Sequence, residues 1–194
     1  MRVIQQYLPN PRRVEQMRIF VAATPEESWN VARHFDMSSI QWVRFLFDLR
    51  TIADHLQHPS HTHIDRRLGV DQIVENGHGF MLLHEESGKE VVVGAIGKFW
   101  KLHIPFADVS PGEFKNFDDE GWGKIAWSIS VEPFLSGSTI SIELRITATD
   151  DESWKKLKRY FQLIGPFSHL IRKTSLSKME RNLGKLQRPK DEHN

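Results

Sequence analysis

The chain has 194 residues, with 26 Lys and Arg against 25 Asp and Glu, so its formal charge is +1. This length suits one domain with a sizeable core, and 39% hydrophobic with 26% charged residues is typical of a globular protein rather than a disordered one. The absence of cysteine excludes disulfides, thiolate zinc sites and cysteine nucleophiles. The aromatic residues are unevenly chosen, with 12 Phe and 6 Trp but only 2 Tyr.

The first part of the chain predicts one strand and two helices. Residues Arg13 to Ala23 have the apolar content of a strand. Thr24-Pro25-Glu26-Glu27 is a helix start, because it combines an N-cap threonine, a proline in the first turn and a capping-box glutamate. We expect this helix to end near Phe35. A second segment, Ser39 to about His55, is apolar around most of its circumference and predicts a largely buried helix.

The pattern then changes to the two-residue period of strands. Apolar and polar residues alternate strictly over residues 139–147, and residues 124–131 do the same. Residues 135–138 predict a turn, so these two segments should form a hairpin. The predicted extended segments are Gly79–His84, Glu90–Trp100, Glu113–Phe117, Trp122–Glu132 and Ser138–Thr149.

A long helix closes the chain. It begins at a capping-box pattern, Thr149-Asp150-Asp151-Glu152, and Gly165-Pro166 should kink or interrupt it before it resumes to about Leu183. The order of elements predicts a single α+β domain with an antiparallel sheet, spanning residues 1–194. Its core should cover about residues 13–183, with 1–12 and 186–194 peripheral.

This order resembles the helix-grip fold of the SRPBCC superfamily, which includes START domains, the birch-pollen allergen family and polyketide cyclase/dehydrase-like proteins. Three stretches look like an uncharacterised bacterial branch of it: GAIGKFW (94–100), IELRITAT (142–149) and YFQLIGPFSHLIR (160–172). The resemblance implies a curved antiparallel sheet wrapped around the long C-terminal helix, with two short helices after the first strand. It also implies a cavity between sheet and helix that often holds an apolar ligand, but it assigns no reaction.

The surplus of Phe and Trp falls on elements that would line such a cavity. An apolar pocket with few polar groups is the usual form of a small-molecule site. The alternative is that these aromatic residues only fill the core. The candidate lining residues are Phe80, Phe99, Trp100, Trp122, Trp127, Trp154 and Phe161.

Four charged residues are candidates for orienting a ligand. Glu143 and Arg145 lie two residues apart on one face of a predicted strand, and Arg44 and Arg50 lie on the second predicted helix. The alternative for the first two is that they pair with each other, or with Lys124, on a solvated sheet face. Arg44 has its own alternative partner one helical turn away, at position 48.

Four histidines are concentrated in a short segment: His55, His58, His61 and His63. His61 and His63 could converge on a metal ion, since imidazole is a common metal ligand. A solvated polar loop explains the segment better, because it lacks an HExxH pattern and Pro59 breaks any helix joining it. The sequence therefore assigns no metal, cofactor or catalytic residue.

Charge is unevenly distributed along the chain. Residues 155–190 contain 11 Lys and Arg and one acid, whereas residues 108–152 contain 10 acids and three bases. We expect a cytoplasmic protein that binds a small apolar molecule (lipid, polyketide-like or aromatic), with acid–base activity of the cyclase/dehydratase type left open. The alternative is an interaction module that binds nucleic acid or an anionic membrane surface through the basic helix. No apolar segment resembles a signal peptide or a transmembrane helix.

Overall fold

The computed structural model describes residues 2–35, 70, 79–101 and 103–186. The predicted helix over 39–55, Arg44, Arg50 and the four clustered histidines lie outside these residues. The elements are α1 (Ile4–Tyr7), β1 (Arg13–Val21), α2 (Pro25–Arg33), β2 (Phe80–Glu86), β3 (Glu90–Gly97), β4 (Gly123–Phe134), β5 (Gly137–Ala148) and α5 (Asp151–Leu186).

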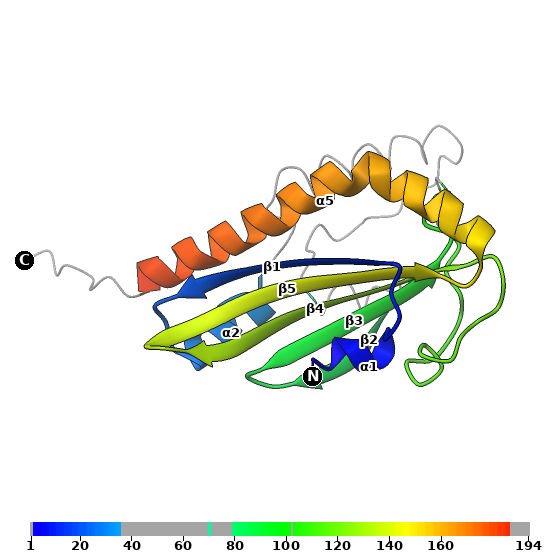
Figure 1. Ribbon diagram of the computed structural model, residues 1–194. Helices are drawn as coiled ribbons and strands as arrows, with labels where there is room; N and C mark the ends of the chain where they lie inside the picture. The colour runs from blue at the N-terminus through cyan, green and yellow to red at the C-terminus, as the bar shows by residue number, and fades with distance from the viewer. Residues whose placement is uncertain (1, 36–69, 71–78, 102, 187–194) are drawn as a thin grey trace, which may run out of the picture.

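The five strands form one antiparallel sheet in the order β1-β5-β4-β3-β2. The first strand of the chain therefore pairs with the last, and β1 and β2 are the two edges. The curved sheet carries α5 along one face, with α2 near one end of it (Figure 1). This arrangement confirms the predicted α+β helix-grip fold, including the hairpin of β4 and β5.

Alternation along β5 separates two faces of the sheet. Ile140, Ile142 and Ile146 pack in the clusters that include α5, and we call this side the inner face. Ser141, Glu143 and Arg145 point to the other side, the outer face. The strict alternation of residues 139–147 is thus confirmed.

The outer face is covered, contrary to the solvated face that the sequence suggests. Ile4 of α1 is completely buried, and it packs with Val92 of β3 and Ala126 of β4. Residues 1–12 are predicted to be peripheral, but α1 folds back and closes this side of the sheet. The predicted strand Glu113–Phe117 is instead a turn, and its Phe114 is completely buried in the same cluster.

The predicted N-cap residue is correct for α2 but not for α5. At α2 the Thr24 hydroxyl accepts the Glu27 amide at 3.3 Å, and the Glu27 carboxylate accepts the Thr24 amide at 2.9 Å, so the capping box is confirmed. At α5 the cap is Asp150 rather than Thr149. Its carboxylate accepts the amides of Ser153 and Gly121, each at 2.7 Å, and these bonds hold the pKa of Asp150 well below its usual range.

The closing helix runs through its proline. Pro166 lies inside α5, which continues from Asp151 to Leu186 without interruption and arches over the sheet (Figure 1). Proline has no amide hydrogen, so it removes one helical hydrogen bond and favours a bend. The sequence therefore predicts the place of the irregularity, and the helix bends instead of ending.

Candidate functional site

Two separate apolar clusters lie on the inner face under α5. One is at the hairpin end of β4 and β5, where Leu176, Met179 and Leu183 of α5 pack on Ile140. The other is at the opposite end of the strands, where Leu157 and Phe161 pack on the sheet. A single row of residues crosses all five strands between these ends, and we call it the inner row: Leu82, Val93, Trp127, Leu144 and Glu15.

The inner row is unevenly covered. Trp127 of β4 and Leu144 of β5 lie on interior strands but are only half-buried, as is Leu82 of the edge strand β2. Val93, on the third interior strand β3, is completely buried. The neighbours of Trp127 along β4 are buried at 9% exposure or less, on both sides of it. The same holds for the isoleucines on both sides of Leu144 along β5. An interior strand in a filled core buries its inward side chains, so Trp127 and Leu144 are less tightly covered than the inward positions on either side of them along their strands.

The inner row ends in a charged pair. Glu15 of β1 forms an ion pair with Arg172 of α5, and its other carboxylate oxygen accepts from Nε of Arg13 at 2.5 Å. The Arg172 side chain is only 9% exposed. A partly buried pair of opposite charges at the rim of an apolar surface can fix the orientation of a ligand that has one polar end.

A groove leads to this pair from the edge of the sheet. It has a volume of about 400 Å³ and lies along the edge strand β1 beside α5. Its lining residues are Arg13, Val14, Glu15, Gln16, Met17, His169 and Arg172. Met17 belongs to the inner face, so the groove connects the protein surface with the inner side of β1. The groove therefore reaches the inner row at its charged end, Glu15.

The predicted aromatic residues divide into three groups. Phe80 and Trp127 lie on the inner face, with Phe80 beside both clusters. Phe99, Trp100, Trp154 and Phe161 belong to the cluster at the far end of the strands, where Phe99 and Phe161 are buried as ordinary core residues. Trp122 packs with Phe117 in the outer-face cluster and does not face α5.

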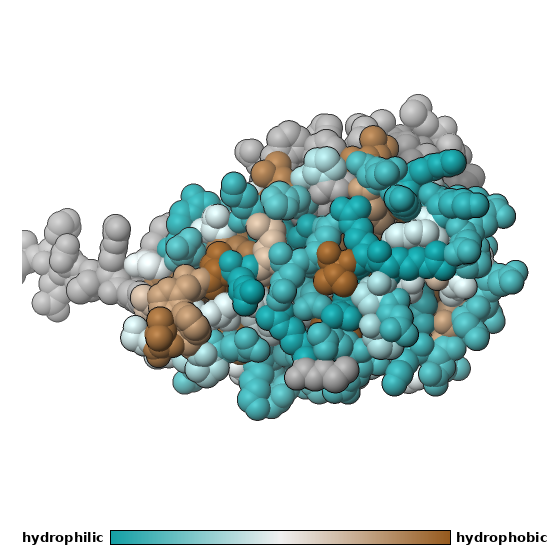
Figure 2. Space-filling view, in the orientation of Figure 1, coloured by the Kyte–Doolittle hydropathy of each residue, from teal (hydrophilic) through white to brown (hydrophobic). Residues whose placement is uncertain are grey.

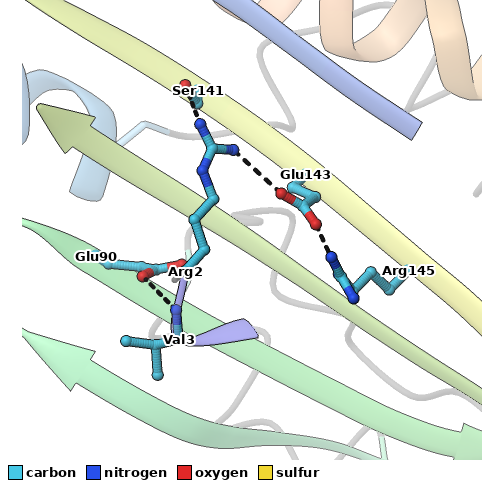
Figure 3. Close-up of polar contacts among 6 residues, drawn as sticks. All are labelled: Arg2, Val3, Glu90, Ser141, Glu143 and Arg145. Atoms are coloured by element: carbon cyan, nitrogen blue, oxygen red, sulfur yellow. Dashed lines mark hydrogen bonds and ion pairs between the residues drawn. The ribbon is translucent and has the colours of Figure 1, made fainter. Parts of the chain in front are cut away.

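The outer face carries a buried polar network (Figure 3). Arg145 donates to Glu143 at 2.6 Å, and Arg2 donates to the other carboxylate oxygen of Glu143 at 3.1 Å and to the hydroxyl of Ser141 at 3.4 Å. The backbone amide of Val3 donates to Glu90 at 3.3 Å. The predicted pairing of Glu143 with Arg145 is therefore present, but it lies beneath α1 and on the side of the sheet away from α5.

Lys124 is also on the outer face and does not join this network. Its ammonium donates to the backbone carbonyls of Lys115 at 3.2 Å and Phe117 at 2.9 Å, and it lies over the ring of Phe114. Burial lowers the pKa of Lys124, while the charge of Asp118 acts in the opposite direction. The outer-face charges thus connect loops and α1 to the sheet, which is a structural role.

Sequence reasoning missed the residues that distinguish the inner row. Leu82 and Leu144 occupy inward positions of their strands, but nothing local marks them as less covered than their neighbours. Glu15 and Arg172 left a faint signal, since each is a charge at an inward position of its strand or helix. Their partnership spans nearly the whole chain, so one sequence does not reveal it.

The fold and the site define an α+β helix-grip protein with a partly covered apolar band between sheet and closing helix. No family model matches the chain, and no curated protein sequence is significantly similar to it. Among solved structures it is similar to protein CV1439 from Chromobacterium violaceum, at 11% identity and a TM-score of 0.38, covering 88% of this chain and 96% of that one. It is also similar to Ara h 8.0201, at 8% identity and a TM-score of 0.25, covering 86% and 97%. None of the described helices has the length and apolar character that crossing a membrane requires.

Proposed function

We propose that this protein is a member of the SRPBCC superfamily that binds a small, largely apolar molecule against the inner row. The observation that carries the proposal is the half-buried state of Trp127 and Leu144 at the centre of the sheet, between two buried clusters. The groove beside β1 supplies access, and the pair of Glu15 and Arg172 supplies the polar end of the site. The ligand class is a lipid-like or aromatic compound with one polar group.

Binding rather than catalysis is the role that the described residues favour. Glu15 is the only titratable member of the inner row, and its carboxylate is already engaged by Arg13 and Arg172. General acid–base catalysis needs a group that exchanges a proton with the substrate at hydrogen-bond distance. A carboxylate held between two guanidinium groups instead suits a fixed anchor.

The test is a titration with Nile red, a neutral apolar dye, followed by fluorescence. The wild type should bind it saturably, and Leu144→Trp should weaken binding about tenfold or more by filling the space above the row. Leu163→Trp is the matched control, because Leu163 is exposed on α5 and does not line the groove. This control should bind like the wild type.

Thermal unfolding of the same variants distinguishes a site from a filled core. Overpacking a filled core costs about 1–3 kcal/mol, whereas a residue placed in open space costs little. The proposal predicts that Leu144→Trp keeps its melting temperature while it loses dye. A large fall in melting temperature for this variant, or no saturable binding by the wild type, would contradict it.

A further inference from the structure

The turn between β4 and β5 has an unusual residue in it. Phe134 pairs with Gly137, so Leu135 and Ser136 form a two-residue hairpin loop. Leu135 has a φ of 51°, and it is the one non-glycine residue with a positive φ in the part of the chain that the structure describes. A positive φ at the first loop position alone is typical of a type II′ turn, in which glycine is favoured there. Leucine is therefore a poor choice for folding this turn.

Leu135 is also unfavourable because its apolar side chain is exposed to water. The Leu135 side chain is 87% exposed, and Phe134 and Phe20 beside it are about half exposed. The two phenylalanine rings meet edge to face with centroids 5.8 Å apart. We call these three residues the hairpin tip. Figure 2 shows a brown, hydrophobic patch at the left, at the end of the molecule where the hairpin of β4 and β5 lies. Neither backbone conformation nor packing explains Leu135, which points to a contact outside the chain.

Basic residues lie on the helix at the same end of the molecule. The C-terminal half of α5 packs beside the end of β1 and the hairpin, as the common cluster of Leu183 and Val21 shows (Figure 1). Arg181 is exposed near Leu183, with the exposed Glu180 beside it. Lys173 is exposed on the same half of α5 but further from this end, next to Arg172. Exposed acids are also near, with Glu132 on the strand that leads into the tip, so any attraction to an anionic surface comes from the helix rather than the hairpin.

We propose that the hairpin tip inserts into the interfacial region of a lipid bilayer, with the basic half of α5 against the head groups. The small size of the patch favours a bilayer over a protein partner. A stable protein interface needs about 800 Å² on each side, which three side chains do not provide. A bilayer needs no complementary surface, and each large apolar side chain that enters it strengthens partitioning by roughly tenfold. Attachment through three side chains is weak and reversible.

The experiment is co-sedimentation of the full chain with vesicles of phosphatidylcholine alone and of phosphatidylcholine mixed with phosphatidylglycerol. Leu135→Gly should reduce the partition coefficient roughly tenfold on both vesicles. The same substitution should leave the melting temperature unchanged or higher, because glycine suits the turn. Leu163→Gln is the matched control: Leu163 is 74% exposed on α5, away from the tip, and its loss should not change vesicle binding.

The basic half of α5 is tested with the double variant Lys173→Gln and Arg181→Gln. It should weaken binding to the vesicles that contain phosphatidylglycerol and leave binding to phosphatidylcholine unchanged. Equal binding by Leu135→Gly and the wild type would overturn the proposal, as would equal losses in Leu135→Gly and Leu163→Gln. Self-association of the wild type that Leu135→Gly abolishes, without vesicle binding by either, would assign the tip to a second copy of the chain and overturn it too. These outcomes do not depend on whether the inner row binds a ligand.

Discussion

Arg145 donates from Nε to Oε1 of Glu143 at 2.6 Å, and both side chains are buried on the side of the sheet turned away from α5. They lie two residues apart on β5, so the pleat of the strand places them on the same face. Arg145 also donates to the carbonyl of Leu8 at 3.0 Å, and Arg2 occupies the other oxygen of Glu143. The pair therefore connects the N-terminal segment to the centre of the sheet.

Arg145→Met should lower the free energy of unfolding by about 3–5 kcal/mol, because it leaves Glu143 buried with only Arg2 as a charged partner. The double variant Arg145→Met, Glu143→Met should lose less than the sum of the two single variants, with a coupling of about 0.5–3 kcal/mol. Urea unfolding of the four proteins measures this. If the losses of unfolding free energy in the two single variants simply add in the double variant, the interaction between Glu143 and Arg145 does not itself stabilise the fold.

Ile4→Ala should cost about 2–5 kcal/mol, since Ile4 is completely buried although it lies in a helix of four residues. Gln6→Ala is the control in the same helix, because Gln6 is exposed, and it should change stability by less than about 0.5 kcal/mol. Urea denaturation distinguishes the two. A cost for Ile4→Ala as small as that of Gln6→Ala would show that α1 does not stabilise the sheet.

Gly94→Ala should destabilise the protein by about 1–3 kcal/mol, because a Cβ at this position of β3 would lie 2.6 Å from Cδ1 of Leu83 and 2.8 Å from Cε2 of Phe114. Gly184→Ala provides the opposite case. Nothing lies within 4 Å of a Cβ there, and alanine is favoured over glycine within a helix by about 1 kcal/mol. Thermal unfolding should therefore give shifts of opposite sign. A neutral Gly94→Ala would mean that Phe114 packs less closely on β3.

Asp150→Ala should destabilise the protein near neutral pH by about 0.5–2 kcal/mol through loss of the α5 cap. The pKa of Asp150 is lowered in the folded state, so its stabilising effect is complete above its unfolded pKa of about 4 and is lost as the pH falls further. The difference between wild type and variant should thus shrink in acid. Asp150→Asn should fall between them, because one amide oxygen replaces two carboxylate oxygens. Urea midpoints across pH measure this, and a pH-independent difference would contradict it.

Local patterns predicted much of the fold because they depend on neighbours in the chain. The two-residue alternation separated the side chains of residues 139–147 into two faces, and the capping box located the start of α2. Thr149 and Asp150 are both good caps, so sequence alone could not choose between them. In the structure Asp150 caps the helix, and its carboxylate also accepts the amide of Gly121.

The candidate site was harder to predict because it depends on which elements cover each face. The alternation of Ser141, Glu143 and Arg145 looks like a solvated face unless one knows that α1 folds back over it. The same pattern cannot show that Trp127 and Leu144 are covered less than their neighbours. Of the aromatic candidates, Trp127 belongs to the inner row and Phe80 lies on the same face next to it. Phe99 and Trp100 follow the end of β3, and Trp122 precedes β4.

The pairing of β1 with β5 has a consequence for synthesis of the protein. β1 leaves the ribosome well before its partner strand β5, because β2, β3 and β4 are made between them. Until then β1 has no place in the sheet, and its apolar residues Met17, Ile19 and Val21 have no core to enter. Domains whose strands pair across long sequence separations fold slowly and expose such segments meanwhile. We therefore expect nascent chains that stop before β5 to recruit chaperones, and chains that include β5 and α5 to be released from them.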